Sequence, residues 1–157
     1  SSESRGLGDV YKRQVYMSTR SRIAIQTKNG EYRSVYHHYD GYPEGVGVTL
    51  QQHIPDYTSA VQLVRGGDIS YIDWDTGFTK YYAKRSSWDD PRGGTDEPWS
   101  WVKPIRSKSF QDLLDVTNGS NGCYLYVYYY GTHNPVCYNM SENAKQTVIP
   151  NSRKEVA

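Results

Sequence analysis

The segment 123–130 constrains the fold more than any other part of the sequence, because it is a strong β-forming run with packable side chains on both faces. Alternate residues of a strand share a face. One face therefore carries Tyr124, Tyr126, Tyr128 and Tyr130, and the other carries Leu125, Val127 and Tyr129. A strand that can pack on both sides belongs in the interior of a sheet.

Two functions are open for these tyrosines. They can form core and cross-strand contacts with tethered hydroxyl groups, or they can form an aromatic surface that stacks a base or seats a partner. The chain has 16 tyrosines and only 2 phenylalanines, a preference that suits half-wet surfaces such as clefts and interfaces.

The remaining patterns predict an α+β fold with an antiparallel sheet built from hairpins and two or three short helices packed on it. Asn29-Gly30 joins two alternating segments as a hairpin turn. Asp56 and Ser109 are helix N-caps. The predicted strands are 22–27, 32–39, 78–83, 123–130 and 136–140, with 99–105 extended and a short strand at 147–149; the predicted helices are 46–54, 56–66 and 109–116.

Both ends of the chain are predicted to lie outside the domain, which spans residues 17–140. Residues 1–14 (SSESRGLGDVYKRQ) resemble the translated read-through of a sequencing adapter, so we expect them to be disordered and without function. Residues 141–157 read as a polar tail.

Composition excludes several classes of protein. The net charge of +1 disfavours a nucleic-acid polymer as partner, and no apolar run approaches the roughly 18 residues of a membrane span. Two cysteines, Cys123 and Cys137, are too few for a disulfide scaffold and indicate reduced thiols. We therefore expect a cytoplasmic protein.

The segment 38–47 (HYDGYPEGVG) is the most informative candidate site, because it leads from a strand into a helix. Gly45 and Gly47 would let backbone amides at the helix start approach a phosphate or carboxylate. Tyr39 and Tyr42 would stack on a base beside it, with Asp40 between them. The alternative is an ordinary strand-to-helix turn, and Glu44 lies where an anion would bind.

A second candidate is the long polar loop 86–98. Arg85, Trp88 and Arg92 would clamp a phosphate and cover a base, although a solvated charged loop has the same composition.

Residues 17–23 (MSTRSRI) and 37–53 (HHYDGYPEGVGVTLQQH) resemble a widespread family of small phage and bacterial proteins. Its members typically begin STRS and carry a Cys-His-Trp-Asp-Gly-Tyr-Pro-Glu-Gly-Val-Gly motif. This chain has His37-His38-Tyr39 where the family has Cys-His-Trp. The resemblance covers about half the chain and implies a small cytosolic phage protein rather than a particular activity.

Catalytic patterns are sparse, so no catalytic residue, metal or cofactor is predicted. His38 near Asp40 could act as an acid/base pair, and Asp73, Asp75, Asp89 and Asp90 could hold a divalent cation. A surface histidine and solvated loop acids explain the same residues.

The sequence therefore predicts a phage counter-defence protein that sequesters a small nucleotide-derived immune signal without cleaving it, as a homo-oligomer. One alternative is a protein–protein inhibitor of a host defence component that uses the tyrosines as hot spots. The other is an enzyme that degrades a cyclic nucleotide, with His38 as the base.

Overall fold

The structure is a computed structural model that describes residues 19–83 and 93–152. The predicted first hairpin is present: β1 (Ser21–Gln26) pairs antiparallel with β2 (Tyr32–His37). Gly30 in its turn has a φ of 86°, a left-handed conformation that glycine adopts without steric cost. The predicted tyrosine strand is β7 (Tyr124–Tyr128), which lies beside β1 and is paired on its other edge with β8 (Val136–Asn139).

Nine strands among the described residues form one mixed sheet, in the order β5-β4-β3-β2-β1-β7-β8-β9, with β6 also paired to β2. Most neighbours are antiparallel, which confirms the α+β prediction, whereas β1–β7, β2–β3 and β4–β5 are parallel. The remaining strands are β3 (Ile69–Ile72), β4 (Thr79–Ala83), β5 (Gly93–Glu97), β6 (Ile105–Ser107) and β9 (Lys145–Thr147).

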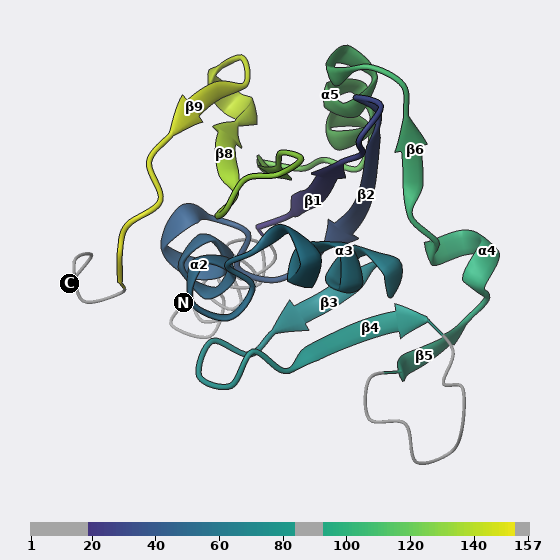
Figure 1. Ribbon diagram of the computed structural model, residues 1–157. Helices are drawn as coiled ribbons and strands as arrows, with labels where there is room; N and C mark the ends of the chain where they lie inside the picture. The colour runs from purple at the N-terminus through teal and green to yellow at the C-terminus, as the bar shows by residue number, and fades with distance from the viewer. Residues whose placement is uncertain (1–18, 84–92, 153–157) are drawn as a thin grey trace, which may run out of the picture.

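Helices cover both faces of the sheet (Figure 1). A π-helical turn, η1 (Pro43–Gly47), leads into α2 (Val48–His53), and α3 (Tyr57–Arg65) follows on the same face. Helix α5 (Phe110–Gly119) covers the opposite face. Both predicted N-caps are confirmed, because Asp56 accepts a hydrogen bond from the Ser59 amide and Ser109 accepts one from the Asp112 amide.

The core has two parts, one on each side of the sheet. The part under α2 and α3 contains Tyr126 and Tyr128 together with aliphatic side chains of β1, β2 and the two helices. The part under α5 contains Leu125 and Val127. Both faces of β7 are therefore buried, as the alternating pattern predicted, and the Tyr126 and Tyr128 hydroxyls donate hydrogen bonds to the backbone carbonyls of Gly41 and Ile54.

Two sequence-based predictions need correction. Residues 99–102 form a short helix, α4 (Trp99–Val102), where an extended segment was expected, and only 105–107 are a strand. The chain beyond residue 140 is not simply a tail: a 3-10 turn, η2 (Met140–Glu142), leads into β9, which pairs with β8, and Ile149 is buried in the core. The apolar side chain of Ile149 gains more from burial than a polar tail would.

Candidate functional site

The segment 40–47 opens a helix as predicted, but its backbone amides are already engaged. The Gly45 amide donates to the Tyr42 carbonyl at 2.9 Å, and the Val46 amide donates to the Asp40 carbonyl at 2.8 Å. Amides that satisfy carbonyls of their own turn are not available to an anion. The sequence assigned them to a phosphate because a π-helical turn, which uses these amides, cannot be recognised from the glycine spacing.

Side chains of the protein fill the space next to the glycines of this segment. A Cβ atom on Gly47 would lie 3.0 Å from Ile149 Cγ2 and 3.3 Å from Tyr126 Cε1, and one on Gly45 would lie 2.5 Å from the Asp40 carbonyl oxygen. Close internal packing thus accounts for both glycines. Three cavities formed by described residues lie elsewhere, and none of them is lined by residues 40–47.

The other candidates from the predicted site, Tyr39, Asp40 and Tyr42, make different contacts. Tyr42 packs back on its own turn, with its hydroxyl 3.4 Å from Asp40 Oδ1. Tyr39 is 39% exposed and meets the His38 ring edge-on, with ring centroids 4.5 Å apart. Arg85, Trp88 and Arg92 lie outside the described residues. Among the predicted site residues, Tyr39 is the one that lies beside a further group of polar and aromatic side chains.

That group lies where β2 ends, and we call it the β2-end cluster; its members are Arg20, Tyr36, His38, Tyr39, Asp68 and Tyr82. The topology creates it, because two strands share the outer edge of β2. Strand β6 pairs with residues Tyr32 to Ser34, and β3 pairs at His37. Asp68 lies between them and accepts a hydrogen bond from the Tyr36 amide at 2.9 Å.

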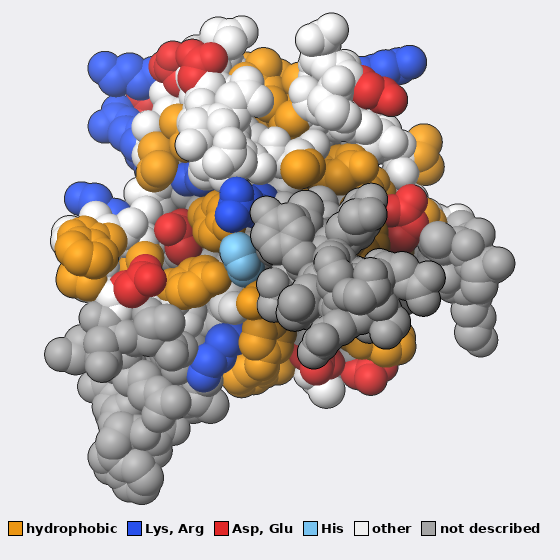
Figure 2. All heavy atoms as spheres, turned by 180° about the vertical axis from the view of Figure 1, so that it is seen from behind, with side chains coloured by type: hydrophobic (Ala, Val, Ile, Leu, Met, Phe, Trp, Pro, Cys, Tyr) orange, Lys and Arg blue, Asp and Glu red, His pale blue; other side chains and the backbone are white. Residues whose placement is uncertain are grey.

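Strand alternation brings the aromatic members of the cluster together. Tyr36 and His38 are two residues apart, and the Tyr36 hydroxyl is hydrogen-bonded to His38 Nδ1 at 2.5 Å. Tyr82 on β4 is hydrogen-bonded to Ser70 on β3. Burial, and to a smaller extent the nearby Tyr39 and Asp68, raise the pKa of Tyr82, and Tyr82 in turn contributes to the raised pKa of Tyr36. Figure 2 shows a face of the molecule on which a histidine lies beside a basic side chain, with hydrophobic and acidic side chains around them.

Arg20 supplies the positive charge of the cluster. Its guanidinium is hydrogen-bonded to the Tyr36 side chain, whereas its buried Nε has no hydrogen-bond partner. Burial, and secondly the charge of Arg20, lower the pKa of His38, which favours the neutral imidazole. A guanidinium beside a neutral imidazole can pair with an anion without a competing positive charge on the histidine.

Two ionisable groups at these strand ends, Asp68 of the cluster and the neighbouring Arg22 on β1, have strongly shifted pKa values. Burial raises the pKa of the Asp68 carboxyl to about 6, against the opposing effects of the Tyr36 amide and Arg22. Burial also lowers the pKa of Arg22 to about 10; its Nε donates to Ser34 Oγ at 2.7 Å. The cluster thus combines the Arg20 cation, a carboxyl group and several aromatic rings, so it can stack a planar ring and pair with an anion.

Other candidate chemistry is limited in the part of the chain that the structure describes. No group of three or more His, Cys, Asp or Glu side chains in these residues comes together to hold a metal ion. Both cysteines are free; Cys123 is exposed, and burial raises the pKa of the Cys137 thiol to about 12. A helix long and apolar enough to cross a membrane does not occur in residues 19–83 or 93–152.

Comparisons with protein-family models, with curated proteins and with solved structures give no match. The function must therefore be argued from the residues. Sequence reasoning identified Tyr39 and His38 but missed Arg20, Tyr36 and Tyr82. Alternation would have placed Tyr36 and His38 on one face, whereas the approach of Tyr82 depends on the pairing of β2 with β3.

Proposed function

We propose that this protein binds a small nucleotide-derived signal at the β2-end cluster and sequesters it without cleaving it. The observation that supports the proposal most directly is the position of Arg20: its guanidinium is hydrogen-bonded to Tyr36 and lies close to His38, against which Tyr39 packs edge-on. Nucleotide ligands combine a planar base with phosphate, and this cluster offers a partner for each.

The ring of Tyr39 is the best stacking surface in the cluster. It is 39% exposed, and its edge-on contact with His38 fixes its orientation. Stacking of one base on an aromatic side chain contributes about 1–3 kcal/mol. The near-zero net charge of the whole chain also favours a small ligand over a long polyanion.

The hydrogen bonds of the cluster favour binding over turnover. His38 Nδ1 is occupied by the Tyr36 hydroxyl, and Asp68 Oδ1 is occupied by the Tyr36 amide. A general base must be within hydrogen-bond reach of the proton that it removes. Groups held by one another in this way are better suited to orienting a ligand than to moving its protons.

The biological part of the proposal is a phage counter-defence role in the host cytoplasm, as a homo-oligomer. It rests on the family resemblance of residues 17–23 and 37–53 and on the same ligand chemistry. Light scattering on the purified protein tests the oligomer. Restored phage growth in cells with a nucleotide-signalling defence tests the role.

The decisive experiment incubates purified protein with a panel of cyclic nucleotides and ADP-ribose derivatives and analyses bound and released material by mass spectrometry. Sequestration predicts a ligand that is recovered intact. A changed product would support the enzyme, whereas no bound small molecule would support the protein–protein inhibitor.

Matched variants then test the location of the site. Tyr39→Ala and Arg20→Met should each weaken binding by about fivefold or more, given the stacking contribution above. Tyr130→Ala is the control, because Tyr130 is also exposed but lies beside Tyr57 and Gln26 at the other end of the sheet. Equal affinities for all three variants and the unmodified protein would remove the β2-end cluster as the site.

A further inference from the structure

A separate groove lies on the opposite face of the sheet from the β2-end cluster. It has a volume of about 290 Å³, and its walls are Ile25, Arg33, Val61, Val64, Arg65 and Pro104. Ile25 and Arg33 are directly paired on β1 and β2 and point toward α3. Tyr36 is an odd number of residues from Arg33 along β2, so the two side chains point to opposite faces.

The walls of the groove are mostly apolar, and two guanidinium groups interrupt them. Val61 and Val64 come from α3, Ile25 from the sheet, and Pro104 from the connection between α4 and β6. Arg33 lies on the sheet side, and Arg65 lies in the last turn of α3. Arg65 there also offsets the negative end of the helix dipole, and Arg33 Nη1 donates to the Tyr32 carbonyl at 3.2 Å, so both guanidinium groups are held in place beside the groove.

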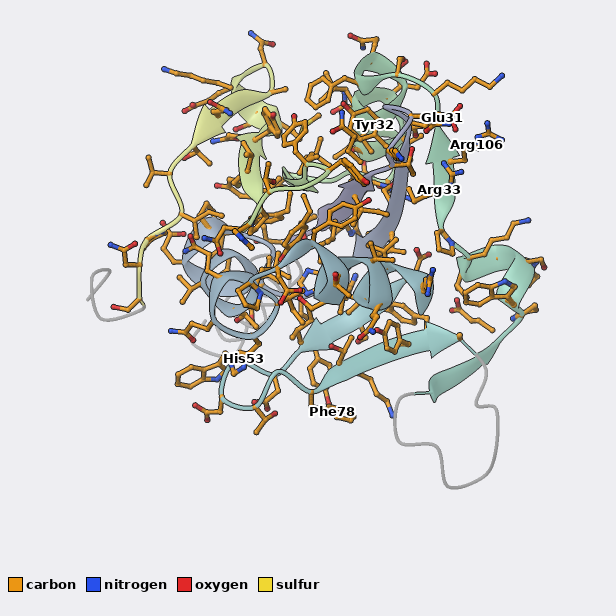
Figure 3. The ribbon with its side chains drawn as sticks, viewed as in Figure 1. Glu31, Tyr32, Arg33, His53, Phe78 and Arg106 are labelled. Carbon is orange, nitrogen blue, oxygen red and sulfur yellow. The ribbon has the colours of Figure 1, made fainter. Side chains whose placement is uncertain are left out.

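The nearby acid, Glu31, offsets only part of the positive charge around the groove. Glu31 accepts two hydrogen bonds from Arg106, at 2.8 and 2.9 Å, and lies 3.6 Å from Arg33 Nη1. Figure 3 shows Glu31, Arg33 and Arg106 together where β2 and β6 run side by side. A second hollow next to Arg33 adds Lys28. One carboxylate shared between two arginines leaves this end of the molecule positive.

The groove offers far more space than one water molecule needs, and it is open to solvent on one side. A single ring or a branched chain with one anionic group can therefore lie in it.

We propose that this groove is a binding site for a small organic anion with an apolar body, such as an aromatic or branched-chain carboxylate. The body lies against Ile25, Val61, Val64 and Pro104, and the carboxylate pairs with Arg33, with Arg65 at the other side. A planar guanidinium matches a carboxylate through two parallel hydrogen bonds. The site is independent of the proposed nucleotide site.

The probe is phenylacetate, which has one aromatic ring and one carboxylate and is small enough to lie in the groove. Titration is followed by nuclear magnetic resonance of the methyl groups of Ile25, Val61 and Val64. Phenylacetamide, with the same shape and no charge, should bind about tenfold more weakly, and acetate, with no apolar body, should leave the methyl signals unchanged.

Variants separate the charge from the shape of the site. Arg33→Gln should weaken phenylacetate binding about tenfold, and Val61→Phe should abolish it by filling the groove. Lys145→Gln removes one exposed positive charge on β9 and should have no effect. The backbone amide spectrum reports whether each variant is folded.

The proposal is overturned if phenylacetate at millimolar concentration leaves the groove methyl signals unchanged. It is also overturned if folded Arg33→Gln and Val61→Phe bind it as the unmodified protein does. Arg20→Met, which removes the cation of the β2-end cluster, should leave phenylacetate binding intact. Failure of the nucleotide proposal is therefore distinguishable from failure of this one.

Discussion

The hydroxyl of Tyr126 should stabilise the whole fold, because it ties the turn before α2 to the middle of the sheet. It donates a 2.7 Å hydrogen bond to the Gly41 carbonyl, and the tyrosine side chain is fully buried. The change Tyr126→Phe removes one oxygen atom and leaves the ring in place. The Gly41 carbonyl then stays buried without this donor.

An unsatisfied buried acceptor costs about 1–3 kcal/mol. For a domain of this size each kcal/mol lowers the melting temperature by about 2–4 °C, so a loss of about 2 kcal/mol should lower it by about 4–8 °C. The effect should also be local: the Val46 amide, hydrogen-bonded to the Asp40 carbonyl at 2.8 Å, should exchange faster with solvent.

The measurement is urea unfolding and amide hydrogen exchange of the variant beside Tyr124→Phe. Tyr124 lies on the same strand and the same face, is partly buried, and has no hydrogen bond from its hydroxyl among the described contacts. Its variant should therefore unfold within about 0.5 kcal/mol of the unmodified protein. Equal stabilities of the two variants would refute the view that the Tyr126 hydroxyl holds this turn in place.

Three further predictions concern packing and pH. Gly47→Ala should cost about 1–3 kcal/mol in urea unfolding because its Cβ would lie 3.0 Å from Ile149 Cγ2, whereas Gly119→Ala, with no atom within 4 Å, should be neutral or slightly stabilising. Burial raises the pKa of Asp68 from 3.8 to about 6, so the native state keeps a proton that the unfolded chain releases. The stability contributed by this group therefore decreases as the pH rises from about 4 to about 6, and Asp68→Asn should abolish that decrease in thermal melts. Burial lowers the pKa of His37 from 6.5 to about 3, so its contribution to stability is complete above pH 6.5 and is lost toward pH 3; thermal melts of His37→Gln across this range should show a shallower acid destabilisation.

Local patterns predicted the local structure well. The hairpin at Asn29-Gly30, the N-caps Asp56 and Ser109, and the two-sided burial of β7 all follow from signals within a few residues. The parallel pairing of β1 with β7 could not be predicted, because alternation shows which face a residue takes but not which strand lies beside it. A short strand was predicted at 147–149, two residues later than β9, and its pairing with β8 could not be predicted for the same reason.

The candidate site could be predicted only in part. Tyr39 and His38 were found because they follow directly on a strand, but Arg20 and Tyr82 come to them through β1, β3 and β4. The glycines of the segment 40–47 show why the rest failed. A missing Cβ can make room for a ligand or for the protein's own side chains, and here Tyr126 and Ile149 take the space beside Gly47.

The position of β1 has a consequence for synthesis of the chain. One edge of β1 pairs with β2, its immediate neighbour in sequence, but the other edge must wait for β7, with Ser21 paired to Tyr124. At a translation rate of about 5–20 residues per second, roughly 5–20 s separate the emergence of these two strands from the ribosome. During that interval the nascent chain exposes an apolar strand edge that can pair with other chains. Slowed translation before residue 124 should therefore increase aggregation of newly made protein, and a chaperone that covers strand edges should reduce it.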